Sequence, residues 1–172
     1  DPLTRPDEVA AALGRLKKEG KVRWFGVSNL NVDQMRMYGQ HFDVECLQPL
    51  YNLLDREVEA HELPYCLEHR IGVIAYSSLA RGLLAGRYTP GQQFDDHRAD
   101  NWRFKGDAFQ RLLEGVEKLR PLAEANGLTV AQFAVRWVIT HPAVTSAIVG
   151  VKRPEHIEGA APAGDGELSA RD

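Results

Sequence analysis

The sequence predicts an α/β fold in which four parallel strands alternate with helices. Short, nearly continuous apolar runs, typical of strands covered on both faces, alternate with segments whose apolar residues recur at helical spacing. Such an alternation implies parallel strands joined by right-handed crossovers. Four strands of this kind form either half of a barrel or a small open sheet. The 172 residues suffice for one domain.

The first predicted element is a helix that follows Thr4 and stops at Gly20. Thr4 is the expected capping residue, and Pro6 lies in the first turn, where its missing N–H costs nothing. Gly20 suits the left-handed residue that ends many helices. One face of this helix is apolar, made of Val9, Ala12, Leu13 and Leu16.

Four strands are predicted over residues 21–27, 44–50, 72–76 and 145–149. The first contains Trp24 and is almost entirely apolar or aromatic, as expected for a strand covered on both faces. The predicted strands are short enough that helices must occupy most of the sequence between them.

The remaining helices are predicted from Asn31 through Tyr38, from His61 to His69, from Asp107 to Leu119, from Thr129 to Pro142, and onward from Pro154. Two of them begin with a capping box, in which Asn31 is matched by Gln34 and Thr129 by Gln132. The stretch from Leu79 to Gly106 is predicted to be irregular. Because loops of this length are uncommon in compact domains, we expect this one to be functional or disordered.

Composition excludes several classes of protein. The net charge of −3 argues against nucleic acid as a partner, since phosphate binding needs a clustered basic surface. No apolar run has the roughly 20 residues of a membrane-spanning helix, so no membrane partner is expected. Two cysteines, Cys46 and Cys66, make no disulfide framework and favour a reducing cytoplasm. Because the sequence starts at Asp1 without Met and stops at Asp172, we expect one partial domain over residues 1–172.

Polar and aromatic groups stand at the end of each predicted strand, which is where barrels of this class carry their chemistry. The four groups are Ser28-Asn29, Gln48, Tyr76-Ser77-Ser78 and Gly150-Val151-Lys152-Arg153. The amides suit a carboxamide, the tyrosine offers a flat face, and two cations before a helix opened by Pro154 suit a phosphate. Together they suit a nicotinamide dinucleotide, although no GxGxxG motif supports a Rossmann site.

Other groupings have simpler explanations. A metal site could be imagined from three residues near one helix face, which are His61, Cys66 and His69, but a surface helix with a buried cysteine explains them. His97 follows two aspartates in the manner of a catalytic pair, and a solvated acidic loop accounts for it. The serines at 77 and 78 lack the GxSxG turn of a hydrolase. We therefore expect no metal site and no hydrolase.

Four phrases of the sequence also resemble the bacterial type of aldo-keto reductase, in order and in spacing. They are GKVRWFGVSN at 20–29, QPLYNLL at 48–54, GVIAYSSLARGLL at 72–84 and AIVGVKRPE at 147–155. In that family these segments are the fifth to eighth strands of a (β/α)8 TIM barrel. The resemblance thus implies the C-terminal half of such a barrel.

The resemblance also implies how a bound NADPH is held. Ser28, Asn29 and Gln48 would hold the nicotinamide carboxamide, and Tyr76 would stack on the ring. The pyrophosphate would be wrapped by Ser77, Leu79, Arg81 and Gly82. The adenosine ribose and its 2′-phosphate would lie along Gly150, Lys152, Arg153 and His156. Two cations at that place favour NADPH over NADH.

Two departures from the family pattern affect function. The family's Glu-Asn pair, which touches the adenine, is replaced by Gly159-Ala160. The catalytic Asp, Tyr, Lys and His come from the first four strands, so they are expected upstream of Asp1. The resemblance therefore implies an NADPH-dependent oxidoreductase that reduces aldehydes and ketones to alcohols, present here as its cofactor-binding half and inactive alone.

A different class of function remains open. A half-barrel that binds a dinucleotide without catalysis could serve as a regulatory or interaction module. Such a half leaves two strand edges unpaired, so self-association through these edges is expected.

Overall fold

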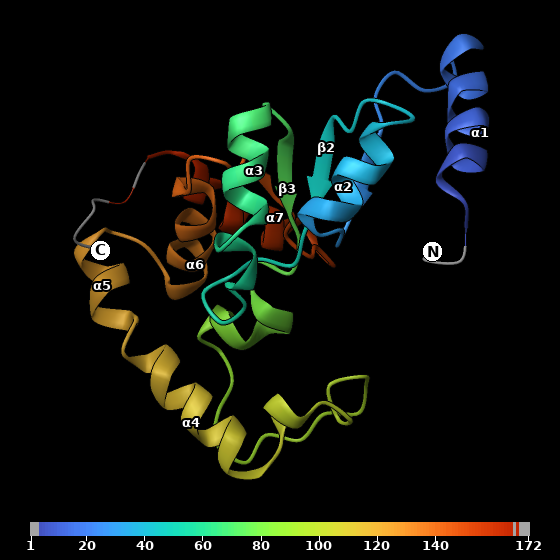
Figure 1. Cartoon of the computed structure of the whole chain (residues 1–172). Helices are drawn as coiled ribbons and strands as arrows, with labels where there is room; N and C mark the ends of the chain where they lie inside the picture. The colour runs from blue at the N-terminus through green and yellow to red at the C-terminus, as the bar shows by residue number, and fades with distance from the viewer. Residues whose placement is uncertain (1–3, 167, 169–172) are drawn as a thin grey trace.

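The computed structural model describes residues 4–166 and residue 168. The strands are β1 (Gly26–Ser28), β2 (Cys46–Gln48), β3 (Gly72–Ala75) and β4 (Ser146–Ala147), and Figure 1 shows β2 and β3 among the helices. They form one sheet in the order β1-β2-β3-β4, and every neighbouring pair is parallel. The predicted alternation of helices with parallel strands is confirmed.

The helices follow the predicted order, with one further helix over Arg120–Ala125 that the sequence did not predict. They are α1 (Pro6–Lys18), α2 (Val32–Gly39), α3 (Glu62–His69), α4 (Gly106–Glu117), α5 (Arg120–Ala125), α6 (Val130–Thr140) and α7 (Pro154–Ala160). Short 3-10 turns cover Glu57–Glu59 (η1), Ala80–Ala85 (η2), Trp102–Phe104 (η3) and Ala161–Gly164 (η4). Two of these turns, η2 and η3, lie inside the stretch that the sequence predicted to be irregular.

Both predicted capping boxes are present. The side chain of Asn31 accepts a hydrogen bond from the Gln34 backbone N–H at 2.9 Å, and that of Thr129 accepts one from the Gln132 backbone N–H at 3.2 Å. The predicted cap of α1 is wrong. Arg5, not Thr4, is the N-cap residue and makes no side-chain cap, so α1 begins with Pro6 alone as its start signal.

The predicted extent of the first strand is also wrong. Pairing begins only at Gly26, and the Trp24 side chain is 68% exposed. β1 is an edge strand, so residues before Gly26 have one possible neighbour rather than two. Phe25 pairs with the residue just before β2, because the Glu45 backbone N–H donates to the Phe25 carbonyl at 3.0 Å.

One core lies between the sheet and the helices on its outer side. Leu47 of β2 and Val73 of β3 are fully buried there against Met35, Leu63 and Val138. The alternate strand residues Cys46, Gln48 and Ile74 point to the opposite face and are only partly buried. The sheet is therefore covered on one face and open on the other.

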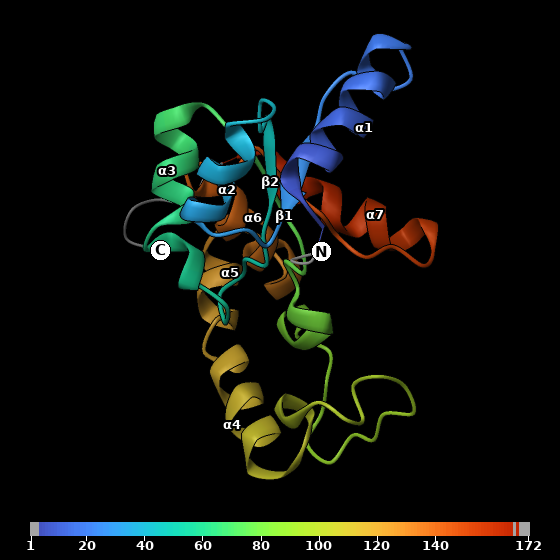
Figure 2. The same ribbon diagram turned by 45° about the vertical axis from the view of Figure 1, so that its right-hand side comes forward.

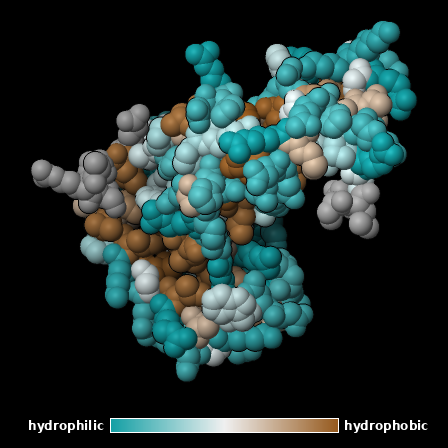
Figure 3. Space-filling view, in the orientation of Figure 1, coloured by the Kyte–Doolittle hydropathy of each residue, from teal (hydrophilic) through white to brown (hydrophobic). Residues whose placement is uncertain are grey.

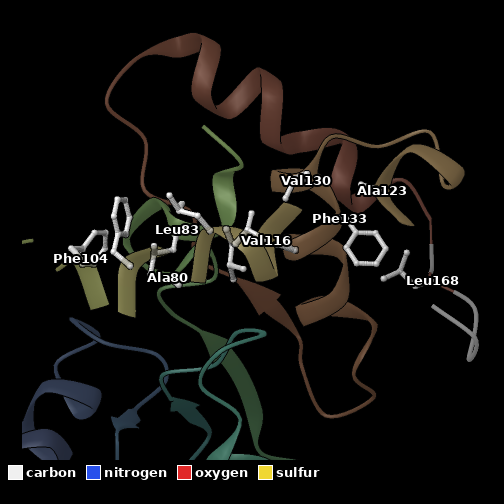
Figure 4. Packing of buried hydrophobic residues seen from close by; sticks show 12 residues of the cluster. Ala80, Leu83, Phe104, Val116, Ala123, Val130, Phe133 and Leu168 are labelled. Atoms are coloured by element: carbon white, nitrogen blue, oxygen red, sulfur yellow. The ribbon is translucent and has the colours of Figure 1, made fainter. Parts of the chain in front are cut away.

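A second core joins α4, α5 and α6 to η2. Figure 4 shows Leu83 and Val116 in it, with Phe133 nearer Leu168. Its aromatic end contains Tyr88 and Phe104, whose ring centroids are 6.2 Å apart. Because these residues come from the stretch 79–106, that loop is folded onto the core.

The two edges of the sheet carry exposed apolar side chains. Trp24 precedes β1, while Ile148 (40% exposed), Val151 and Ile157 follow β4. Helix α1 stands apart from the other helices in Figure 1, its lower end is drawn next to β1 and α7 in Figure 2, and none of its described residues is buried. Figure 3 shows further apolar side chains gathered between α5 and α6. Such surfaces mark places where other protein packs.

In the described part of the chain, no helix is both long enough and apolar enough to cross a membrane.

Candidate functional site

The tips of β1 and β2 are hydrogen-bonded to each other. Ser28 is in register with Gln48, and its hydroxyl donates to the Gln48 carbonyl at 2.8 Å. The Asn29 backbone N–H donates to the same carbonyl at 3.2 Å, and Asn29 takes a left-handed φ of 55°. Within the described residues, the side-chain amides of Asn29 and Gln48 make no hydrogen bond, so both remain able to bind a ligand.

The tips of β2, β3 and β4 continue the same edge. The Tyr76 backbone N–H donates to the Pro49 carbonyl at 3.0 Å, and Tyr76 forms a parallel bridge with Leu50. The Ser78 hydroxyl donates to the Ile148 carbonyl at 3.3 Å. The carboxyl ends of all four strands thus lie together at one end of the sheet, where parallel α/β proteins bind ligands.

The turn after β3 is backbone-strained. Ser77, Ala80 and Arg81 have left-handed φ values of 60°, 47° and 57°. Gly82 has a φ of 95°, and a Cβ there would lie 2.2 Å from the Tyr88 hydroxyl oxygen. Left-handed conformations at residues other than glycine are costly and tend to occur at functional sites. Gly82 is thus required both by conformation and by the closeness of Tyr88.

A pocket of about 200 Å³ opens beside this turn. Its lining includes three of the residues predicted to bind cofactor, Tyr76, Ser77 and Arg81. The other lining residues are Leu50, Asp55, Ala80, Asn101, Trp102, Arg103 and Phe104. Leu79 and Gly82 belong to the same turn without lining the pocket.

An ion pair that sequence reasoning missed forms one wall of this pocket. The Arg103 guanidinium donates to both carboxylate oxygens of Asp55, at 2.6 and 2.8 Å. The Asn52 amide donates to Asp55 at 3.0 Å and to the Ser77 carbonyl at 3.1 Å. The hydrogen bond from Arg103 holds the pKa of the Asp55 carboxyl below its ordinary value. No spacing rule joins residues 55 and 103, so the sequence offered no signal for this pair.

The predicted phosphate residues lie on the link between β4 and α7. Gly150, Lys152 and Arg153 are all exposed. The Nδ1 atom of His156 accepts a hydrogen bond from the Lys152 backbone N–H at 3.2 Å, which fixes the link against α7. In the described part of the chain, no hydrogen bond or ion pair joins these residues to the strand tips. Lys152 and Arg153 follow Ile148 by four and five residues.

The position that departs from the family pattern has a structural use. The Gly159 carbonyl accepts a hydrogen bond from the Gln132 side chain at 2.7 Å, which ties α7 to α6. Gly159 and Ala160 have no side chain able to hydrogen-bond to an adenine.

The alternative groupings stay apart. His69 stacks on Tyr65 with ring centroids 4.0 Å apart, and burial raises the pKa of the Cys66 thiol to about 11. No three His, Cys, Asp or Glu side chains among residues 4–166 and 168 gather closely enough to hold a metal ion. Asp96 is bonded to Arg98 at 2.7 Å and lies 4.0 Å from His97, so it serves the loop rather than a catalytic pair.

A larger groove of about 580 Å³ runs between α2 and α3. It is lined by residues such as Arg36, His61 and Tyr65 and by none of the residues predicted to bind cofactor. The smaller pocket at the strand tips is therefore the candidate site, because of these two it is the one that combines strained backbone with convergent polar groups.

The family match and similar relatives all point to one protein family. The whole chain, residues 1–172, matches the aldo/keto reductase family. It is 36% identical over 161 residues to the aldo-keto reductase YhdN of Bacillus subtilis, covering 92% of this chain and 49% of that protein. It is 31% identical to the NADH-specific methylglyoxal reductase of Escherichia coli, covering 87% of this chain and 46% of that protein.

A solved structure agrees with the sequence comparisons. The glycerol dehydrogenase AKR11B4 of Gluconobacter oxydans superimposes with a TM-score of 0.93 at 34% identity, over 99% of this chain and 53% of that one. This chain spans about half the length of the relatives it matches. The four strands correspond to half of a TIM barrel, as the resemblance implied. The chain belongs to the aldo/keto reductase family.

Proposed function

We propose that these residues form the dinucleotide-binding half of a reductase that uses NADPH to convert small aldehydes or ketones to alcohols. The observation that supports the proposal most is that the carboxyl ends of the four strands lie at the same end of the sheet, beside a pocket lined by Tyr76 and Arg81. Members of the family work with nicotinamide cofactors.

The groups present fit a dinucleotide. The unpartnered amides of Asn29 and Gln48 can bond both the oxygen and the nitrogen of a carboxamide. Tyr76 offers a ring in the pocket, and Arg81, which is exposed, offers a cation for a pyrophosphate. Beyond β4, the exposed Lys152 and Arg153 suit a further phosphate.

The bound cofactor supplies the hydride, while these residues orient it. Bonds from Ser28, Asn29 and Gln48 would fix the carboxamide, and stacking on Tyr76 would then select the ring face that is presented. Reduction also needs a proton donor at the developing alkoxide. We propose that this donor comes from the barrel units that these 172 residues do not contain.

A titration followed by a turnover assay tests this function. The purified chain should bind NADPH, seen as a change in nicotinamide fluorescence, and should not oxidise it when a reactive aldehyde is added. Binding would support the assignment of the strand tips. Turnover by the chain alone would place a proton donor within it, and absence of binding would refute the proposed function.

We also propose that the chain associates with itself when it stands alone. β1 and β4 are parallel edge strands, so β1 of one copy can pair in parallel with β4 of another, and two such pairings close a barrel. Replacing the half-exposed Ile148 by lysine should weaken this association about tenfold, because a charge would be buried at the edge.

Sedimentation velocity checks this expectation, with Leu67→Lys as the control. Leu67 is 51% exposed on α3, away from both edges, so its replacement should leave the association unchanged. A purely monomeric chain at all concentrations would contradict the proposal.

We propose a reducing cytoplasm as the location of the protein. Cys46 and Cys66 are both unpaired thiols, as is usual in that compartment.

A further inference from the structure

Asp55 and Arg103 join the two loops that follow β2 and β3. Their side chains meet through two parallel hydrogen bonds although 48 residues separate them in the chain. Asp55 is only 6% exposed, so this pair is shielded from solvent much more than a surface ion pair. Two parallel hydrogen bonds between a guanidinium and a carboxylate fix the orientation of the arginine side chain as well as its distance from the carboxylate.

Asn52 connects the pair to the strained turn. It is fully buried, and its amide bonds both the Asp55 carboxylate and the Ser77 carbonyl. Its own oxygen accepts the backbone N–H groups of Leu54 and Asp55, at 2.8 and 3.1 Å. Arg103 is therefore linked to the turn that carries Ser77 through Asp55 and Asn52.

Trp102 is held in place by its neighbours while its own side chain stays exposed. Phe104 is buried in the aromatic end of the second core, and Asn101 accepts the Arg103 backbone N–H at 3.0 Å. The indole of Trp102 is nevertheless 65% exposed and lines the same pocket as Tyr76. The Arg103 guanidinium lies 5.5 Å from its ring centroid. A large exposed aromatic group at a pocket is typical of a ligand contact.

We propose that Trp102 contacts the bound dinucleotide, and that Asp55 and Arg103 are positioning residues that hold Trp102 at the pocket. The inference rests on the proposed function. Asp55 binds two of the five N–H groups of Arg103 and balances the charge of the guanidinium, so we assign Arg103 a role through Trp102 rather than on a phosphate. Arg81 forms no ion pair within the described residues and is the cation left to meet the pyrophosphate.

Energy transfer from tryptophan to bound NADPH tests the contact. The chain has three tryptophans, and Trp24 is as exposed as Trp102 but precedes β1. Trp102→Phe should remove most of the transfer per bound NADPH, and Trp24→Phe should leave it almost unchanged. Equal transfer in the two variants would overturn the contact.

Binding kinetics test the positioning pair. Arg103→Met keeps the stem of the side chain and removes the ion pair, so the segment 101–104 would hold its present position for only part of the time. If that part is about one tenth, the apparent affinity for NADPH falls about tenfold. We expect faster dissociation, less energy transfer per bound NADPH, and partial recovery in Arg103→Lys, which retains the charge.

The control is Arg120→Met, which breaks an exposed ion pair with Glu117 between the end of α4 and the start of α5. Calorimetry measures affinity without relying on tryptophan, and urea unfolding identifies variants that are folded.

Unchanged affinity and energy transfer in folded Arg103→Met would overturn the positioning role alone. If the unmodified chain binds no NADPH, the proposed function fails and this inference with it. Should Arg103→Met not fold, Arg103→Lys and Trp102→Phe decide the question.

Discussion

Replacing Asn52 by alanine is expected to lower the free energy of unfolding by about 3 kcal/mol. Asn52 is fully buried, and its amide makes hydrogen bonds to Asp55 and Ser77 and accepts from Leu54. Alanine would leave the Leu54 N–H and part of the Asp55 carboxylate without these partners. Unsatisfied buried polar groups cost far more than an average hydrogen bond contributes.

Urea unfolding of Asn52→Ala measures this loss, with Asn126→Ala as the matched control. Asn126 is partly exposed, and among the described residues its side-chain amide bonds just the Leu122 carbonyl, so its replacement should cost well under 1 kcal/mol. If the two variants lose the same stability, the network around Asn52 does not hold the site together.

The same network makes stability depend on pH in the acid range. The pKa of Asp55 is lowered in the folded chain because Arg103 bonds its carboxylate. The resulting stabilisation is fully present above the unfolded pKa of an aspartate and is lost as the pH falls through the lower, folded pKa. Asp55→Asn should therefore flatten this part of the acid unfolding curve.

Replacing Lys152 and Arg153 together by alanine is expected to weaken NADPH binding roughly thirtyfold and to leave NADH binding unchanged. Both cations are exposed, so a phosphate bound there keeps some solvent, and we take about 2 kcal/mol for the pair. NADH lacks the 2′-phosphate and gains nothing from them. The E. coli relative named as NADH-specific makes this comparison informative.

Parallel titrations with the two cofactors check the prediction. The control variant replaces Arg15 and Lys18 on α1, which are also exposed, and changes the net charge equally. Equal affinity of the unmodified chain for NADPH and NADH would refute the role of the two cations. A similar loss in the control would assign the effect to long-range charge alone.

The sequence predicted the fold well wherever a local rule determines structure. The capping boxes at Asn31 and Thr129 and the alternation of strands with helices follow from neighbouring residues. The prediction of the first strand was wrong because β1 is an edge strand of the sheet. Trp24 has the composition of a buried strand, yet β1 has a neighbour on one side only, so Trp24 stays exposed.

The candidate site could be predicted only in part for a related reason. Parallel strands end at a common edge, so Ser28, Gln48 and Tyr76 could be placed near each other from their positions alone. The bond between Asp55 and Arg103 depends on how a long loop folds back, which periodicity does not encode. The irregular composition of residues 79–106 indicated function or disorder and concealed an aromatic core around Phe104.

Chemical-shift mapping of the isotope-labelled chain during an NADPH titration tests most directly whether one nucleotide engages every strand tip. The account predicts that the backbone amides of Asn29, Gln48, Ser77 and Lys152 shift together and fit a single dissociation constant. Shifts confined to one tip, or to the groove between α2 and α3, would contradict it.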